Sequence, residues 1–120
     1  MTNQSLMKVM LVDDEFLALE DLRTLIPWRA HGFEIVSTAT NGKMALELFE
    51  RFLPDLLIVD VKMPIMDGME LLRRLSLQYP DKYPKVILLT AYKEFDYARE
   101  ALQYHVSGYL LQHTIDELSL

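Results

Sequence analysis

Acidic side chains and one hydroxyl stand where apolar runs of strand length end. Asp13 and Asp14 follow the first run, Asp60 follows a second, and Thr90 follows a third. In an open α/β sheet, ligands bind beyond the carboxyl ends of the strands. We therefore expect these three carboxylates and this hydroxyl to lie at one sheet edge, where they would form a site for a cation and a phosphoryl group.

The chemistry of such a cluster depends on a counter-charge. Two unit charges 4 Å apart repel each other by about 4 kcal/mol at an effective dielectric constant of 20, so bare carboxylates would not gather without a cation. Oxygen ligands without imidazole or thiolate favour Mg²⁺, and Mn²⁺ should substitute. Asp60 would be the nucleophile that forms an acyl phosphate. Thr90 Oγ and the backbone N–H of Ala91 would donate hydrogen bonds to the phosphoryl group.

Each of these residues also has an ordinary structural interpretation. An Asp-Asp pair after a strand, such as Asp13-Asp14, is typical of a turn or a helix N-cap. A β-branched residue such as Thr90 is common at a strand end. Asp67 is expected to cap the third helix and not to bind metal, and Gly68 is expected to accommodate the backbone.

The elements that must position these residues alternate along the chain. Nearly continuous apolar strands separated by helices indicate an α/β fold with a parallel sheet covered on both faces. We expect strands at residues 8–12, 34–39, 56–59, 85–89 and 108–111. We expect helices at residues 16–26, 42–52, 68–79 and 94–105.

Composition limits the class of protein. A chain of 120 residues is expected to form one domain, with residues 1–6 disordered or an expression remnant and residues 7–120 forming the domain. Apolar runs are too short for a membrane span, and cysteine is absent, which fits a cytoplasmic protein without membrane contact. A net charge of −6 with scattered basic residues argues against direct DNA binding. Thr114 and Glu117 match a capping box, so we expect an incomplete last helix and a missing continuation.

These motifs resemble those of a bacterial response-regulator receiver domain, a CheY-like module of two-component signalling. The resemblance covers about residues 7–118 and is carried by the run PDLLIVDVKMPIMDG, the acidic pair after the first strand and the Thr-Ala pair. It implies a doubly wound, flavodoxin-like sheet of five strands in the order 2-1-3-4-5. It also implies that a sensor histidine kinase phosphorylates Asp60.

The same resemblance implies roles for further residues. Asp14 and Asp60 would bind Mg²⁺ directly, Asp13 would bind it through water, and Lys62 would contribute its carbonyl. Thr90 and Tyr109 match the switch pair, which would remodel a face formed by helix four, strand five and helix five. We expect a possible homodimer through this face.

Two further stretches are similar to receivers joined to AraC-type helix-turn-helix domains. They are the segment Leu25-Ile26-Pro27-Trp28 with Gly32-Phe33, and the segment 91–98. The resemblance implies transcription regulation by a DNA-binding output domain outside the chain. Trp28 and Phe33 are also expected to pack the first helix against the sheet.

One position departs from the receiver pattern. Receivers usually carry a lysine just after the fifth strand, where this chain has Gln112. A charged lysine contributes a hydrogen bond of about 1.5–3 kcal/mol, whereas a neutral group contributes about 0.5–1.5 kcal/mol. We therefore expect phosphorylation to survive while coupling to Thr90 and Tyr109 weakens.

The alternatives are a non-switching interaction module, a phosphatase and a flavin-binding domain. The interaction module is considered because Gln112 stands where receivers usually carry a lysine. A phosphatase of the haloacid-dehalogenase type would need a second carboxylate two residues after Asp60, where Lys62 stands. A flavin domain would need a phosphate loop after the first strand, where the acidic residues would repel the phosphate. We expect a phosphorylated switch and not an enzyme.

Overall fold

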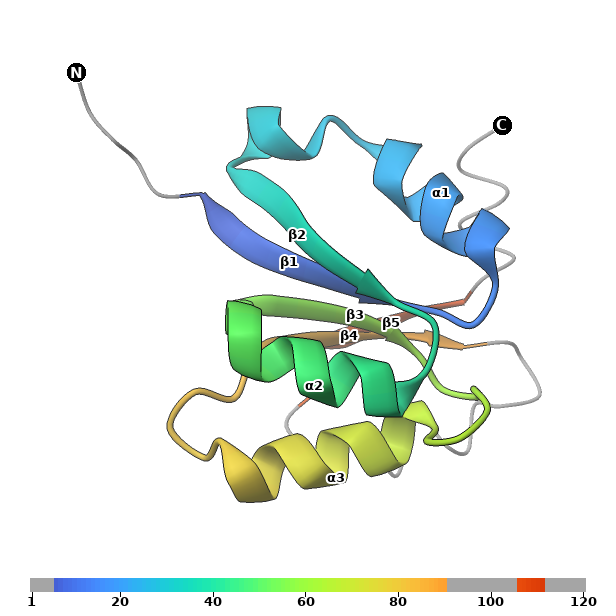
Figure 1. Cartoon of the computed structure of the whole chain (residues 1–120). Helices are drawn as coiled ribbons and strands as arrows, with labels where there is room; N and C mark the ends of the chain where they lie inside the picture. The colour runs from blue at the N-terminus through green and yellow to red at the C-terminus, as the bar shows by residue number, and fades with distance from the viewer. Residues whose placement is uncertain (1–5, 91–105, 112–120) are drawn as a thin grey trace.

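Five parallel strands form the central sheet of the protein. The computed structural model describes residues 6–90 and 106–111. The strands pair in the order β2-β1-β3-β4-β5 (Figure 1), which is the order implied by the resemblance to receiver domains. Their bounds are β1 Met7–Val12, β2 Phe33–Ala39, β3 Leu56–Asp60, β4 Lys85–Thr90 and β5 Gly108–Leu111.

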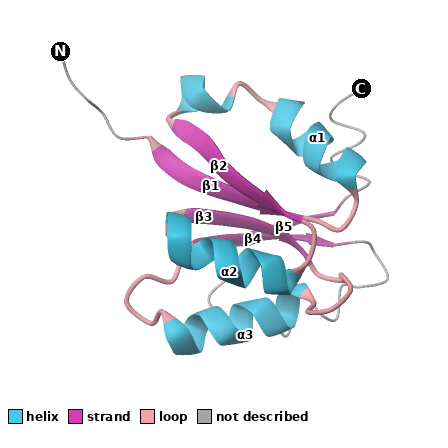
Figure 2. Cartoon of the chain, in the orientation of Figure 1, coloured by secondary structure: helices cyan, strands magenta, loops and turns pink. Residues whose placement is uncertain are grey.

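Helices cover both faces of this sheet. Figure 2 shows α1 (Phe16–Leu25) on one side and α2 (Gly42–Phe52) with α3 (Gly68–Gln78) on the other. The expected helix 94–105 and the incomplete last helix lie outside the described residues. In the part of the chain that is described, no helix is both long enough and apolar enough to cross a membrane.

Strand side chains alternate between two apolar cores. Met10 and Val12 pack with residues of α2 and α3, whereas Val9 and Leu11 pack with residues of α1. This alternation follows from the strand geometry, in which successive side chains point to opposite faces. Because both faces are covered, residues 9–12 of β1 and 57–60 of β3 are all buried, which explains the continuous apolar runs.

Most element bounds agree with the sequence prediction to within one residue. The first helix ends at Leu25 and not at Ile26, whose backbone is extended because a proline follows. The third helix ends at Gln78 and not at Tyr79, and β2 begins at Phe33. The prediction ended the third strand at residue 59, but β3 includes Asp60, which pairs with Leu89. The acceptor candidate is therefore held by the sheet itself.

A short 3-10 helix, η1 (Trp28–His31), was not predicted. It ends at Gly32, whose φ of 88° lies in the left-handed region that favours glycine. The Trp28 indole N–H donates to the carbonyl of Leu22 at 2.9 Å, and its ring meets Phe33 edge-on at 6.1 Å. The expected packing of Trp28 and Phe33 beside the first helix is confirmed.

Candidate functional site

Asp13, Asp14 and Asp60 meet at the carboxyl edge of the sheet. Val12 of β1 pairs with Val59 of β3, so the residues that follow them are neighbours. One carboxylate oxygen from each aspartate lies within 4.8 Å of the others. This edge lies at the right of Figure 1, where β1 leads to α1 and β3 leads to the loop before α3. The predicted convergence of the three carboxylates is confirmed, whereas the side chain of Thr90 is not described.

Asp13 is fully buried, and among the described residues only one of its oxygens has a partner. Oδ1 accepts a hydrogen bond from the Glu15 N–H at 2.9 Å, whereas Oδ2 is buried with no hydrogen-bond partner in this part of the chain. Burial raises the pKa of this carboxyl to about 6, and the negative charges of Asp14 and Glu15 add to the rise. Residues 6–90 and 106–111 therefore supply no positive charge that lowers the pKa of this carboxyl.

A divalent cation fits this arrangement. Three carboxylates offer only oxygen atoms, which are the ligands that Mg²⁺ and Mn²⁺ take in proteins. Oδ2 of Asp13 is buried at the site, and a cation there would offset the burial and the repulsion that raise the pKa of this carboxyl. Asp14 is exposed and Asp60 is 7% exposed, so the site is open on one side.

The loop that follows Asp60 passes close behind it. The Gly68 N–H donates to the carbonyl of Val61 at 2.8 Å. A Cβ atom on Gly68 would collide with the carbonyl oxygen of Asp60 and would lie 3.2 Å from the Cα of Val61. Glycine at this position is therefore required by close approach, as the sequence predicted. Lys62, whose carbonyl is the expected fourth ligand, lies in this loop with an exposed side chain.

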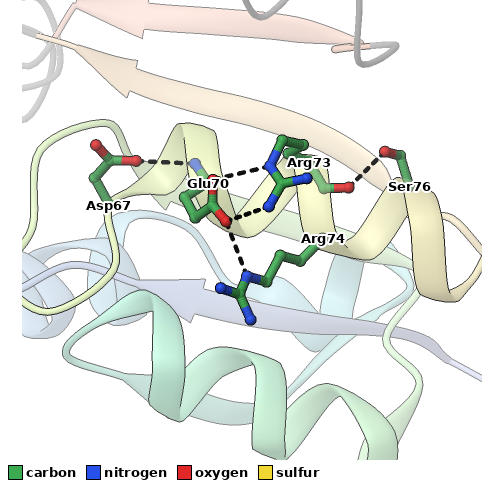
Figure 3. Close-up of polar contacts among 5 residues, drawn as sticks. All are labelled: Asp67, Glu70, Arg73, Arg74 and Ser76. Carbon is green, nitrogen blue, oxygen red and sulfur yellow. Dashed lines mark hydrogen bonds and ion pairs between the residues drawn. The ribbon is translucent and has the colours of Figure 1, made fainter.

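Asp67 caps α3, as predicted. Its Oδ1 accepts from the Glu70 N–H at 2.9 Å (Figure 3), and its carboxylate is not part of the acidic cluster. Glu70 in turn binds Arg73 and Arg74, whose hydrogen bonds lower its pKa to about 2. These side chains are largely exposed, so the ion pairs contribute little to stability. Their effect is to order the first turns of the helix that follows the loop.

The expected switch residues lie on adjacent strands. Thr90 is the last residue of β4, and Tyr109 of β5 pairs with Leu88. The structure describes the backbone of these positions but not the side chains of Thr90 and Tyr109. Ala91 and Gln112 lie outside the described residues. The roles assigned to these four residues remain predictions.

Sequence comparison identifies similar proteins over most of the chain. The family model of the response regulator receiver domain matches residues 9–118. The uncharacterized transcriptional regulatory protein YesN of Bacillus subtilis is 39% identical over 105 residues, covering 88% of this chain and 28% of YesN. The transcriptional regulatory protein HptR of Staphylococcus aureus strain N315 is 37% identical over 105 residues, covering 88% of this chain and 40% of HptR. The chain thus spans less than half the length of these relatives.

Solved structures share the fold. The REC domain of AraT, a response regulator from Geobacillus stearothermophilus, superposes with a TM-score of 0.81 at 35% identity, covering 95% of this chain and 93% of that one. A two-component transcriptional regulator AraC from Clostridium phytofermentans superposes with a TM-score of 0.78 at 30% identity, covering 94% of this chain and 90% of that one.

Proposed function

The chain belongs to the response regulator receiver domain family, and on this basis we propose that Asp60 accepts a phosphoryl group from a sensor histidine kinase. The observation that carries the proposal is the meeting of Asp60 with Asp13 and Asp14 at the carboxyl edge of the sheet. A receiver domain is part of a two-component system, which implies a kinase partner and an output. Relatives named as transcriptional regulators indicate that the output is control of transcription.

In the proposed transfer, a carboxylate oxygen of Asp60 forms a bond to phosphorus while the bond between phosphorus and the donor nitrogen breaks. The leaving imidazole keeps the electron pair of that bond, and Asp60 becomes an acyl phosphate. Asp60 pairs with Leu89 at the end of β3, so its backbone is held by the sheet before the donor arrives. Thr90 Oγ and the Ala91 N–H are proposed to donate hydrogen bonds to the phosphoryl oxygens.

Mg²⁺ is proposed to be held by Asp14, Asp60 and the Lys62 carbonyl, with Asp13 acting through water. When bound, the cation neutralises charge on the transferring phosphoryl group. Asp13 and Asp14 place negative charge around Asp60, so the metal-free site should resist a phosphate donor. Mn²⁺ should substitute because it takes the same oxygen ligands.

The phosphorylated domain is proposed to act as a switch and not as an enzyme, because it transfers the phosphoryl group to its own Asp60 and turns over no separate substrate. We propose an AraC-type DNA-binding output in a longer protein, since the chain is similar to structures described as AraT and AraC. Switching would proceed through Thr90 and Tyr109, and a homodimer would form through the face of helix four, strand five and helix five. A cytoplasmic location without membrane contact is part of this proposal.

Phosphorylation of Asp60 can be tested with acetyl phosphate and intact-mass spectrometry. With Mg²⁺ we expect the wild type to gain the mass of one phosphoryl group, and EDTA should prevent the gain. Asp60→Asn should gain nothing. Asp67→Asn is the matched control, because it makes the same change at a residue that only caps α3. A wild type that gains no mass with Mg²⁺ would contradict the proposal.

The alternative is a receiver-like interaction module whose switching is weak, and it is favoured by Gln112 alone. The two functions differ in the response of the domain to phosphorylation. A phosphorylated protein whose amide NMR spectrum changes only around Asp60 would support the module, whereas changes that extend through β5 would support the switch.

A further inference from the structure

The loop that follows Asp60, residues 61–67, rests against the start of α2. We refer to it as the acceptor loop. The Gly42 N–H donates to the carbonyl of Met66 at 2.8 Å. A Cβ atom on Gly42 would lie 2.5 Å from the Met66 carbonyl oxygen and 2.8 Å from Met66 Cγ. The side chain could rotate away from such an atom, but the backbone carbonyl could not. Only glycine at position 42 allows this approach.

This contact is also part of the N-terminal cap of α2. The first four N–H groups of a helix have no partner inside the helix. Asn41 Oδ1 accepts from the Met44 N–H at 2.8 Å, and the acceptor loop supplies the Met66 carbonyl to the Gly42 N–H. The positive end of the helix dipole favours an oxygen at this place. The loop and the helix start therefore stabilise each other.

The acceptor loop is also closed on itself, and its backbone is strained. The Gly68 N–H donates to the Val61 carbonyl at 2.8 Å, so the start and the end of the loop meet beside β3. Between Val61 and the Met66 contact, Ile65 has a φ of 71°, and the Met66 N–H donates to the Pro64 carbonyl at 2.7 Å. This is a γ-turn with a β-branched central residue in the left-handed region, which is costly unless the surroundings impose it. The contacts at Gly42 and Gly68 are those surroundings.

We propose that Gly42 is a positioning residue for the phosphorylation site. It allows α2 to hold the acceptor loop, which contains Lys62, close to Asp60. The atoms nearest to a Cβ at position 42 belong to Met66, so Gly42 would act through the loop. This inference rests on the proposed function, because the loop matters only if the metal and the phosphoryl group bind beside it. Nothing in the sequence pattern assigns this role, since glycine at a helix start is ordinarily explained by the turn before it.

The variant Gly42→Ala tests the contact. Alanine normally favours a helix over glycine, so without the contact this variant should be more stable than the wild type. We expect the opposite, with the midpoint of thermal unfolding in EDTA lowered by about 5 °C. The Mg²⁺ dissociation constant from calorimetry should rise about tenfold. Amide NMR shifts of the metal-free variant should change along the acceptor loop.

Lys43→Ala is the matched control, because it changes the next, exposed residue of the same helix turn. It should leave the midpoint, the metal affinity and the loop shifts as in the wild type. Gly42→Ala combined with Ile65→Gly should recover part of the Mg²⁺ affinity, because glycine at position 65 lets the loop adjust. A general loss of stability would not be repaired in this way.

A measurement on the wild type keeps the proposal testable if Gly42→Ala does not fold. Hydrogen exchange of the Gly42 amide should slow about tenfold on addition of Mg²⁺, because an ordered acceptor loop protects that N–H. An exchange rate that does not change overturns the proposal, as does a Gly42→Ala variant that binds Mg²⁺ like the wild type. If the wild type binds Mg²⁺ but accepts no phosphate, the proposed function fails while the effect of Gly42 on metal affinity can still be confirmed.

Discussion

Replacing Asp13 by asparagine should stabilise the metal-free protein at neutral pH. Burial, reinforced by the charge of Asp14, raises the pKa of Asp13 from its ordinary value of 3.8 to about 6. The folded state then binds a proton at Asp13 more tightly than the unfolded state does. The protonated carboxyl therefore contributes to the free energy of unfolding below about pH 4, and this contribution is lost as the pH rises through about 6. The difference between the two pKa values corresponds to about 3 kcal/mol in the free energy of unfolding. Asparagine carries no charge and keeps an oxygen for the Glu15 N–H.

Urea unfolding of both proteins in EDTA measures this effect. At about pH 4 the free energies of unfolding should be similar, and at about pH 7.5 the Asp13→Asn variant should be more stable by about 3 kcal/mol. This difference moves the urea midpoint by about 1–3 M. Saturating Mg²⁺ at the higher pH should stabilise the wild type much more than the variant, because the carboxylate and not the amide carries the charge that attracts the cation.

Asp14→Asn is the control for the buried position. Asp14 is exposed, so removing its charge should stabilise the protein in the same direction but by much less. The reasoning is refuted if the wild type and Asp13→Asn differ by the same amount at both pH values, or if the wild type is the more stable protein in EDTA at about pH 7.5.

Three further predictions concern the core, the 3-10 helix and the atypical position. Phe49→Ala removes a fully buried ring whose centroid lies 4.8 Å from that of the Tyr79 ring. This change should lower the free energy of unfolding by about 3–5 kcal/mol in urea titrations. Trp28→Phe removes the hydrogen bond to Leu22 and should cost about 1 kcal/mol without changing the Mg²⁺ dissociation constant in calorimetry. Gln112→Lys should raise the phosphorylation rate with acetyl phosphate and strengthen the spectral change at Tyr109, and equal rates with equal spectral changes would contradict the role given to Gln112.

Much of the site was predictable because strand periodicity is a local property. Asp13 and Asp60 each follow an apolar run, and the carboxyl ends of parallel strands share an edge. That β1 and β3 are neighbours in the sheet was implied by the resemblance to receiver domains and not by periodicity. The cap at Asp67 was predictable for the same reason, since an N-cap depends on residues only three apart. The helix end at Leu25 was missed by one residue because proline restricts the residue before it. The 3-10 helix was missed because its Trp28 contact depends on α1 and β2 together.

The residue types alone determined an alternating α/β chain with acidic residues at its strand ends, because side-chain periodicity and turn chemistry act over a few neighbouring positions. Tertiary structure alone decided that Oδ2 of Asp13 is buried without a hydrogen-bond partner among the described residues and that Gly42 contacts Met66. Burial and close approach depend on elements that lie far apart in the chain, and no local pattern records them. These are the features that give the acidic cluster its need for a cation and hold the acceptor loop beside it.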